Sequence, residues 1–277
     1  MHAQTIRRKR QRINNLTYAF FVGPALILFA TFVLVPLGLA FYYALQDWNG
    51  ISISYHYIGL ENFIKVFKEP AYLKSFGFSF SFMAVSAVLL NLIGLLIALA
   101  LNQKLKLRTV FRTVYFMPMV ISAVVVGYLW NIIIIRFFPW LGNVIGSSLL
   151  QKNWFSYQDT AFAALVMSTV WQSFGYYMLL YLTGLQTIPG ELLEAAAIDG
   201  AGGIKRLYKV AFPLMLPTFT TCIFLSIING LKAFDLIYSL TAGGPFGGTT
   251  SIALQIYLDA YKRDLLSYAS AKAIIFS

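Results

Sequence analysis

The hydrophobic pattern of the chain consists of long, almost uncharged runs separated by short polar segments. A helix needs about 20 apolar residues to cross the ~30 Å hydrocarbon core of a bilayer. Five runs reach that length, and they cover residues 16–45, 73–102, 110–136, 160–184 and 213–240. A sixth run begins at residue 265 and stops at residue 277, so we expect the chain to continue beyond that point. The pattern predicts an all-α polytopic membrane protein with six transmembrane helices.

Composition and charge support this class of protein. The chain is 59% hydrophobic and 11% charged, whereas a soluble domain is about 45–50% apolar and about 25% charged. Its net charge is +11, but the basic residues lie in short segments beside the apolar runs, as membrane topology requires. The single Cys222 lies within an apolar run, which excludes a disulfide framework and a cysteine-based metal site.

The distribution of Lys and Arg predicts the topology. Residues 1–15, the segment around residues 103–112 and the segment 185–212 together carry 12 basic residues and three acids. The polar segments on the other side carry seven basic residues and six acids. Because an excess of Lys and Arg marks the cytoplasmic side, we expect the amino terminus and residues 185–212 in the cytoplasm.

The polar segment 185–212 has the sequence pattern of two short helices joined by a turn. Pro189 and the acidic residues after it favour the start of a helix. Asp199-Gly200 predicts a turn, and a second helix over residues 203–211 would present basic side chains. The residues that define this predicted docking platform are Glu191, Glu194, Ala195, Ala196, Asp199, Gly200, Lys205, Arg206 and Pro213.

The spacing of Glu194-Ala195-Ala196, Gly200 and Pro213 resembles the EAA motif of permease subunits of binding-protein-dependent ABC importers. We call residues 185–212 the EAA loop. Residues 234–245 (FDLIYSLTAGGP) resemble a signature of the carbohydrate-type permeases, and residues 59–63 (GLENF) resemble one of their outer-loop motifs. The resemblance extends over nearly the whole chain and indicates a MalF/UgpA-like permease with the type I ABC importer fold.

The resemblance implies a non-enzymatic subunit that forms the pathway for a sugar or oligosaccharide in the plasma membrane of a prokaryote. Its partners would be a second permease subunit, two cytoplasmic ATPases and an external solute-binding protein. The chain has no G-x-x-x-x-G-K-[ST] loop, so ATP and Mg²⁺ would bind to the ATPases. The alternatives are a permease for glycerol 3-phosphate or an acidic sugar and, more remotely, a stand-alone channel or a membrane enzyme.

Candidate pathway residues follow from the register with the maltose permease subunit of that family and from nearby aromatic residues. They are Trp171, Gln172, Ser173, Tyr176, Tyr177, Ser226, Asn229, Gly230 and Ala233. Asn229 and Ala233 depart from the relative's residues, which makes maltose itself a poor expectation. Hydroxyl, amide and aromatic groups suit a sugar, but Ser and Asn also link transmembrane helices.

Three charged residues lie within the last two apolar runs. Lys232 and Asp235 are three positions apart, so on a continuous helix they share a face and can pair. We expect them near the outer end of their span as a structural ion pair. Lys272 has two alternatives: it faces a cavity and binds an anionic solute, or it extends outward to the membrane surface.

Overall fold

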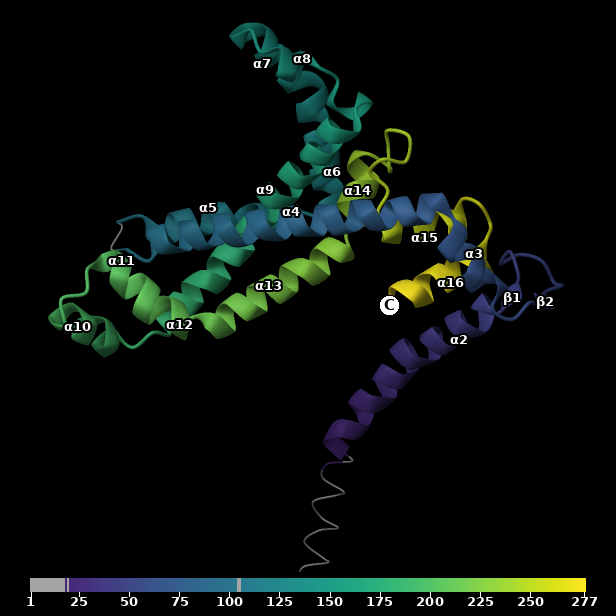
Figure 1. The fold of residues 1–277 in the computed structure, drawn as a ribbon, viewed down its shortest axis with the longest axis horizontal. Coiled ribbons are helices and arrows are strands. Elements are labelled where there is room, and N and C mark those ends of the chain that lie inside the picture. The colour runs from purple at the N-terminus through teal and green to yellow at the C-terminus, as the bar shows by residue number, and fades with distance from the viewer. Residues whose placement is uncertain (1–17, 19, 104–105) are drawn as a thin grey trace, which may run out of the picture. The chain divides into compact units, whose positions relative to one another are not determined.

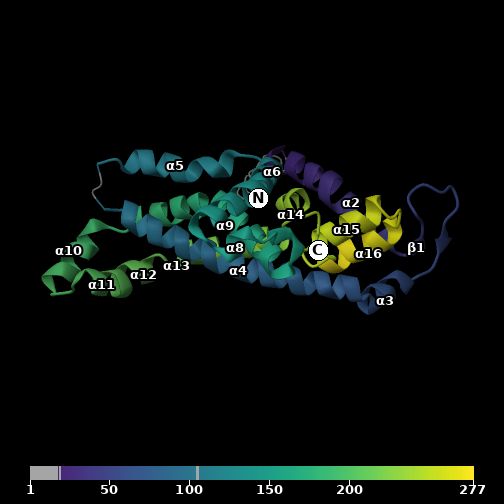
Figure 2. The ribbon, with the colours of Figure 1, turned by 90° about the horizontal axis from the view of Figure 1, so that it is seen from above.

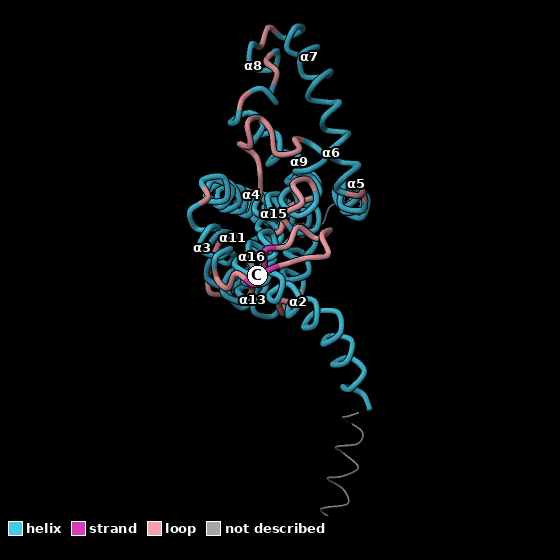
Figure 3. The backbone as a smooth tube through the Cα atoms, turned by 90° about the vertical axis from the view of Figure 1, so that its right-hand side faces the viewer, coloured by secondary structure: helices cyan, strands magenta, loops and turns pink. Residues whose placement is uncertain are grey.

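The computed structural model describes residues 18, 20–103 and 106–277. Helices form most of this backbone, and one short β-ladder is the only sheet among these residues (Figure 1 and Figure 3). The predicted basic anchor, residues 1–15, lies outside the described part of the chain. The backbone forms two compact units. Unit 1 comprises residues 1–69 and 256–277, and unit 2 comprises residues 70–255.

Unit 1 combines both ends of the chain. Its elements are the helix Phe20–Ala44, which contains the π-helical turn η1 (Ala30–Leu34) and α2 (Val35–Ala44), the strands β1 (Gln46–Asp47) and β2 (His56–Tyr57), and the helices α3 (Glu61–Lys68) and α16 (Leu266–Phe276). The strands pair antiparallel, with Gln46 opposite Tyr57. Helix α16 packs against α2 and α3, so this unit holds residues that lie about 200 positions apart in sequence.

Unit 2 is a helical bundle. Its elements are α4 (Pro70–Leu101), α5 (Arg108–Val120), α6 (Ala123–Ile132), η2 (Ile133–Phe137), α7 (Phe138–Ile145), α8 (Ser148–Gln151), η3 (Trp154–Ser156), α9 (Gln158–Gln186), α10 (Gly190–Ile198), α11 (Gly203–Arg206), η4 (Leu207–Ala211), α12 (Phe212–Leu214), α13 (Leu216–Leu231) and α14 (Asp235–Leu240). Helix α15 (Ile252–Tyr261) begins in unit 2 and ends in unit 1.

Helix α4 is the central element of unit 2, where α9 and α13 pack along it (Figure 1 and Figure 2). Glycines permit this close packing. A Cβ atom on Gly94 of α4 would lie 2.9 Å from the Tyr177 Cβ on α9, and one on Gly230 of α13 would lie 2.9 Å from the Met83 Cα. Small residues of this kind let apolar helices approach closely, so dispersion contacts can replace the hydrophobic effect that lipid does not supply.

Three π-helical turns share a sequence feature: each ends two residues before a proline. The turns are η1, η2 and η4, and the prolines are Pro36, Pro139 and Pro213. A proline ring has no N–H and collides with the carbonyl of the residue four positions earlier, which lies inside each of these turns. Widening the turn to a local π-helix relieves that collision.

Three described helices are both long and apolar enough to cross a membrane: Phe20–Ala44, Pro70–Leu101 and Ala123–Ile145. The count rises to four if Gly203–Leu214 and Leu216–Leu231, which bend by 70°, form one broken span. Helix α9 has 29 residues but contains Gln, Ser and several Tyr residues that lower its apolarity. The all-α class is therefore confirmed, and the count of six spans stays a prediction.

Two of the predicted continuous runs are divided in the structure. The run 110–136 breaks at Ile121 and Ser122, three and four residues after Pro118. Their ψ angles of 135° and 138° are those of extended backbone, which ends α5. The run 213–240 bends at Met215 and breaks again over residues 232–234. Helix α15 lies in a segment that the sequence pattern assigns to a loop.

Candidate functional site

The main polar cavity of unit 2 has a volume of about 480 Å³. Its walls come from α4, α9, α13 and α14 and from the break between α5 and α6. The residues that line it are Phe82, Ser86, Leu90, Met119, Ile121, Ala123, Thr169, Gln172, Ser173, Tyr176, Tyr177, Ser226, Asn229, Gly230, Lys232, Ala233, Phe234, Asp235 and Leu236. The helix breaks at residues 121–122 and 232–234 therefore both contribute to the cavity, and the bend at Met215 does not.

The structure brings eight of the nine predicted pathway residues together on this wall: Gln172, Ser173, Tyr176, Tyr177, Ser226, Asn229, Gly230 and Ala233. Trp171 is the exception. It lines a separate apolar groove, where its ring lies 5.8 Å from that of Trp130 in an edge-to-face arrangement. Neighbouring residues of a helix point about 100° apart, so Gln172 faces the cavity while Trp171 faces away from it.

Two amide side chains fix the shape of the cavity. The Gln172 Nε2 donates to the carbonyl of Ile121 at 2.9 Å, and this bond satisfies the backbone exposed by the α5–α6 break. Asn91, which sequence analysis missed, accepts from the Tyr181 hydroxyl at 2.6 Å and donates to the Ser226 Oγ at 2.9 Å. The Asn91 network thus joins α4, α9 and α13 and leaves Ser226 at the cavity wall.

The predicted pairing of Lys232 with Asp235 on one helix is wrong. Lys232 ends α13 and Asp235 begins α14, and the Phe234 between them has φ −136° and ψ −61°. No ion pair joins the two among the described residues. Both side chains are exposed and line the cavity, so the break turns two charged residues toward the polar space.

Lys272 adopts neither predicted arrangement. Its side chain is fully buried within unit 1, where the ammonium binds the carboxylates of Asp259, at 2.5 Å, and Glu69. Asp259 also binds Arg263 at 2.6 Å, and Glu69 accepts a hydrogen bond from Tyr268 at 2.7 Å. These five residues form a charge network that is buried at Lys272 and Asp259 and exposed at Arg263. It has two cations and two carboxylates, so its formal charges cancel. The network connects α15, α16 and the end of α3.

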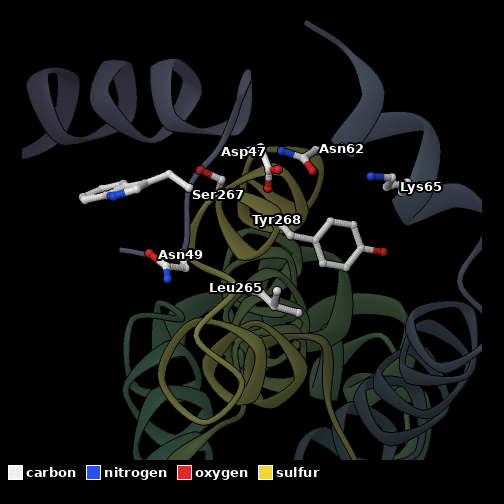
Figure 4. Close-up of a pocket in the computed structure, with 8 residues that line it drawn as sticks. Asp47, Asn49, Asn62, Lys65, Leu265, Ser267 and Tyr268 are labelled. Carbon is white, nitrogen blue, oxygen red and sulfur yellow. The ribbon is translucent and has the colours of Figure 1, made fainter. Parts of the chain in front are cut away.

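A smaller cavity of about 260 Å³ lies within unit 1, and Figure 4 shows the side chains around it. The Asn62 Nδ2 donates to the carbonyls of Ala44 and Gln46 at 2.9 and 2.8 Å and so joins α3 to the chain after α2. Lys65 binds Glu61 at 2.8 Å, and this hydrogen bond raises the pKa of Lys65. None of the predicted pathway residues lines this cavity.

The EAA loop folds as two short helical segments joined by a tight turn. Helix α10 ends at Ile198 with Asp199 as its C-cap, and Gly200 follows with φ +75°. The Ala201 N–H donates to the carbonyl of Ala196 at 2.9 Å, and the Gly200 N–H donates to the carbonyl of Ala197 at 3.1 Å. This pair of bonds is the Schellman motif, which needs a left-handed residue at its turn and therefore favours glycine.

The surface of the EAA loop is unusually apolar for a polar segment. Ile198, Ile204 and Tyr208 are 87%, 86% and 73% exposed. The exposed residues of the predicted platform are Glu191, Glu194, Ala195, Asp199 and Lys205. Ala196 and Arg206 are half-buried, and Pro213 lies in the first turn of α12. Exposed apolar side chains next to charged ones are typical of a surface that another protein covers.

The comparison with known families decides the class of this chain. Within the described residues, no three His, Cys, Asp or Glu side chains gather as metal ligands. Residues 90–277 match the family of binding-protein-dependent transport system inner membrane components. The chain belongs to this family. The predicted recognition is confirmed, and the permease is a non-enzymatic membrane component of a transport system.

Relatives of the permease extend the match over most of the chain. A probable permease for starch degradation products from Thermoanaerobacterium thermosulfurigenes is 34% identical over 262 residues, which is 95% of this chain and 89% of the relative. The sn-glycerol-3-phosphate permease protein UgpA from Yersinia pestis is 33% identical and covers 92% of this chain and 86% of its own length.

A solved structure has the same fold as the permease. It is the bacterial alginate ABC transporter in complex with a periplasmic protein that holds an alginate pentasaccharide. The TM-score is 0.79 at 21% identity, and the match covers 96% of this chain and 90% of the other. The importer permease fold is thereby confirmed, and the family match together with the apolar helices makes the permease a multi-pass protein of the plasma membrane.

Proposed function

We propose that this permease forms one half of the pathway through which an importer moves a sugar or oligosaccharide into the cell. The observation that carries the proposal is the 480 Å³ cavity, whose wall combines hydroxyl, amide and aromatic side chains. Such groups bind sugar hydroxyls and stack on sugar rings. The substrates of a relative and of the solved transporter, starch degradation products and alginate, agree with a carbohydrate.

The EAA loop is the proposed contact with a cytoplasmic ATPase. Its Schellman turn gives a short, rigid shape, and its exposed Ile204 and Tyr208 offer apolar area to a partner. Glu194 and Lys205 would add polar contacts at the rim. ATP and Mg²⁺ would bind to two such ATPases, and a second permease subunit would complete the pathway. The Lys and Arg distribution supports a cytoplasmic amino terminus and a cytoplasmic EAA loop.

The experiment is uptake of radiolabelled sugars by proteoliposomes that contain the assembled importer and its solute-binding protein. Glu194→Ala should reduce uptake and solute-stimulated ATP hydrolysis together, because the EAA loop then binds the ATPase less tightly. The permease should still insert into the membrane. Asp159→Ala removes an exposed acid from the first turn of α9 and serves as the control. Unchanged uptake with Glu194→Ala would contradict the coupling role.

Gly200 offers a second variant with an internal control. A Cβ at Gly200 meets nothing within 4 Å, so only its φ of +75° resists substitution. Left-handed backbone costs roughly 1–2 kcal/mol for most residues, and Asn tolerates it better. Gly200→Val should therefore impair coupling and Gly200→Asn should largely preserve it; equal effects of the two would argue against the turn as the important feature.

The second candidate solute is glycerol 3-phosphate or an acidic sugar. The observations in its favour are the glycerol-3-phosphate relative and the cation Lys232 on the cavity wall. Both solutes belong in the uptake panel, and transport of the phosphate in preference to every neutral oligosaccharide would decide for this candidate.

A further inference from the structure

The cavity wall of unit 2 carries one positive and one negative side chain. Among its lining residues, Lys232 and Asp235 are the only ones with a formal charge, and both are exposed. The rest of the wall is made of hydroxyl, amide, aromatic and aliphatic groups. The cavity is therefore amphoteric and has no net formal charge, which separates it from a pocket built for anions.

Helix ends explain how these two charges can face a cavity without pairing with each other. Lys232 is the C-cap of α13, where the helix dipole is negative, and Asp235 lies in the first turn of α14, where it is positive. The backbone thus supplies part of the opposite charge that each ion needs. The Ala233 carbonyl between them accepts from the Ser251 Oγ at 2.9 Å, so the break itself leaves that acceptor satisfied.

An ordinary structural role is less consistent with this geometry. A stabilising ion pair would bring the two side chains together within 4 Å, and no such pair joins them among the described residues. Charges that extend to a membrane surface would not line the same cavity as Gln172, Tyr176 and Asn229. Charged groups inside a membrane protein usually face a pathway or a partner.

We propose that Lys232 and Asp235 form a solute-binding subsite for a neutral polyhydroxy compound. The Asp235 carboxylate accepts hydrogen bonds from solute hydroxyls, and the Lys232 ammonium donates to a solute hydroxyl oxygen. Hydrogen bonds to ionised groups are stronger than those between neutral groups. An anionic solute is attracted by the Lys232 ammonium but repelled by the Asp235 carboxylate, so the pair favours neutral sugars. This inference rests on the proposed function and names its solute class.

The test is protection of single cysteines from a hydrophilic thiol reagent. Cys222 is the only cysteine of the chain and is buried, so Cys222→Ser gives a cysteine-free background. Lys232→Cys and Asp235→Cys are made on this background and labelled in the assembled importer. Lys152→Cys and Asp159→Cys are matched controls, because Lys152 is also a helix C-cap, Asp159 also lies in a first helical turn, and both are exposed away from the cavity.

We expect the thiol reagent to label all four single cysteines. A neutral oligosaccharide that the wild-type importer transports should slow labelling at positions 232 and 235 and leave both controls unchanged. Glycerol 3-phosphate should protect neither. Absence of labelling at 232 and 235, or labelling that the transported sugar does not slow, would overturn the subsite. Protection by glycerol 3-phosphate alone would overturn its preference for neutral solutes.

Uptake by charge variants provides the second measurement. Asp235→Asn and Lys232→Met should each lower uptake at saturating binding protein by about tenfold, the loss expected for a hydrogen bond to a charged group. Lys232→Arg and Asp235→Glu should retain most of it. Uptake within twofold of wild type for both neutral variants would overturn the subsite while leaving sugar transport intact. Failure of the wild type to import any sugar would instead refute the proposed function.

Discussion

Lys272 at the centre of the charge network provides the sharpest stability prediction. Its side chain and that of Asp259 are 0% and 1% exposed, and that of Glu69 is 22% exposed. Lys272→Met removes the cation and leaves two carboxylates facing each other. Breaking a buried ion pair by removing one partner costs about 3–5 kcal/mol. Arg263 still neutralises part of the Asp259 charge, so we expect a loss near the lower limit, about 3 kcal/mol.

The assay is equilibrium unfolding of the purified permease in mixed micelles, followed by tryptophan fluorescence. Lys65→Met is the matched control, because the Lys65–Glu61 pair is more than half exposed on both sides and should contribute nothing measurable. The double variant Lys272→Met with Asp259→Asn removes one charge of each sign and should recover at least about 1 kcal/mol relative to the sum of the single variants. Equal effects of Lys272→Met and Lys65→Met, or strict additivity in the double variant, would refute the reasoning.

Two further predictions concern the packing of unit 2. Gly175→Ala places a Cβ 1.9 Å from a backbone oxygen of α5, so we expect loss of monodisperse protein in size-exclusion chromatography. Gly190→Ala is the control: its added Cβ meets nothing within 4 Å, so this variant should behave as wild type. Asn91→Leu removes the acceptor of the Tyr181 hydroxyl and should lower the unfolding free energy by about 1–3 kcal/mol, whereas Ser226 keeps its bond to the Ile223 carbonyl. A loss no greater than that of Tyr181→Phe would contradict this.

Register with the permease family predicted much of the cavity lining. Eight candidate residues meet there because register along α9 and α13 carries over from the permease family, and because polar groups in apolar helices turn toward polar space. Trp171 was assigned to the wrong side, since the sequence does not say which side of α9 meets α4. The error over Lys232 and Asp235 has another cause: no Pro or Gly between them signals the break, so a continuous helix was the natural expectation.

Ion pairs between residues far apart in sequence could not be predicted from local sequence patterns. Lys272 binds Asp259, 13 positions away, and Glu69, about 200 positions away, and no pattern around any of them predicts the others. The turn at Gly200, in contrast, was predictable because the Schellman motif involves only neighbouring residues. The prolines after η1, η2 and η4 are equally visible in the sequence, but the sequence analysis did not predict the widened turns before them.

Those three π-helical turns have a consequence for helix phase. A π-helical turn holds one more residue than an α-helical turn, so residues beyond it are rotated by about 100° relative to an uninterrupted α-helix. A helical wheel drawn across η1, η2 or η4 therefore assigns the wrong face to whatever follows. At η4 the offset separates α11, which presents the exposed Ile204, from α12. The face on which α11 presents Ile204 is therefore rotated by about 100° from the face that an uninterrupted helix would give it relative to α12.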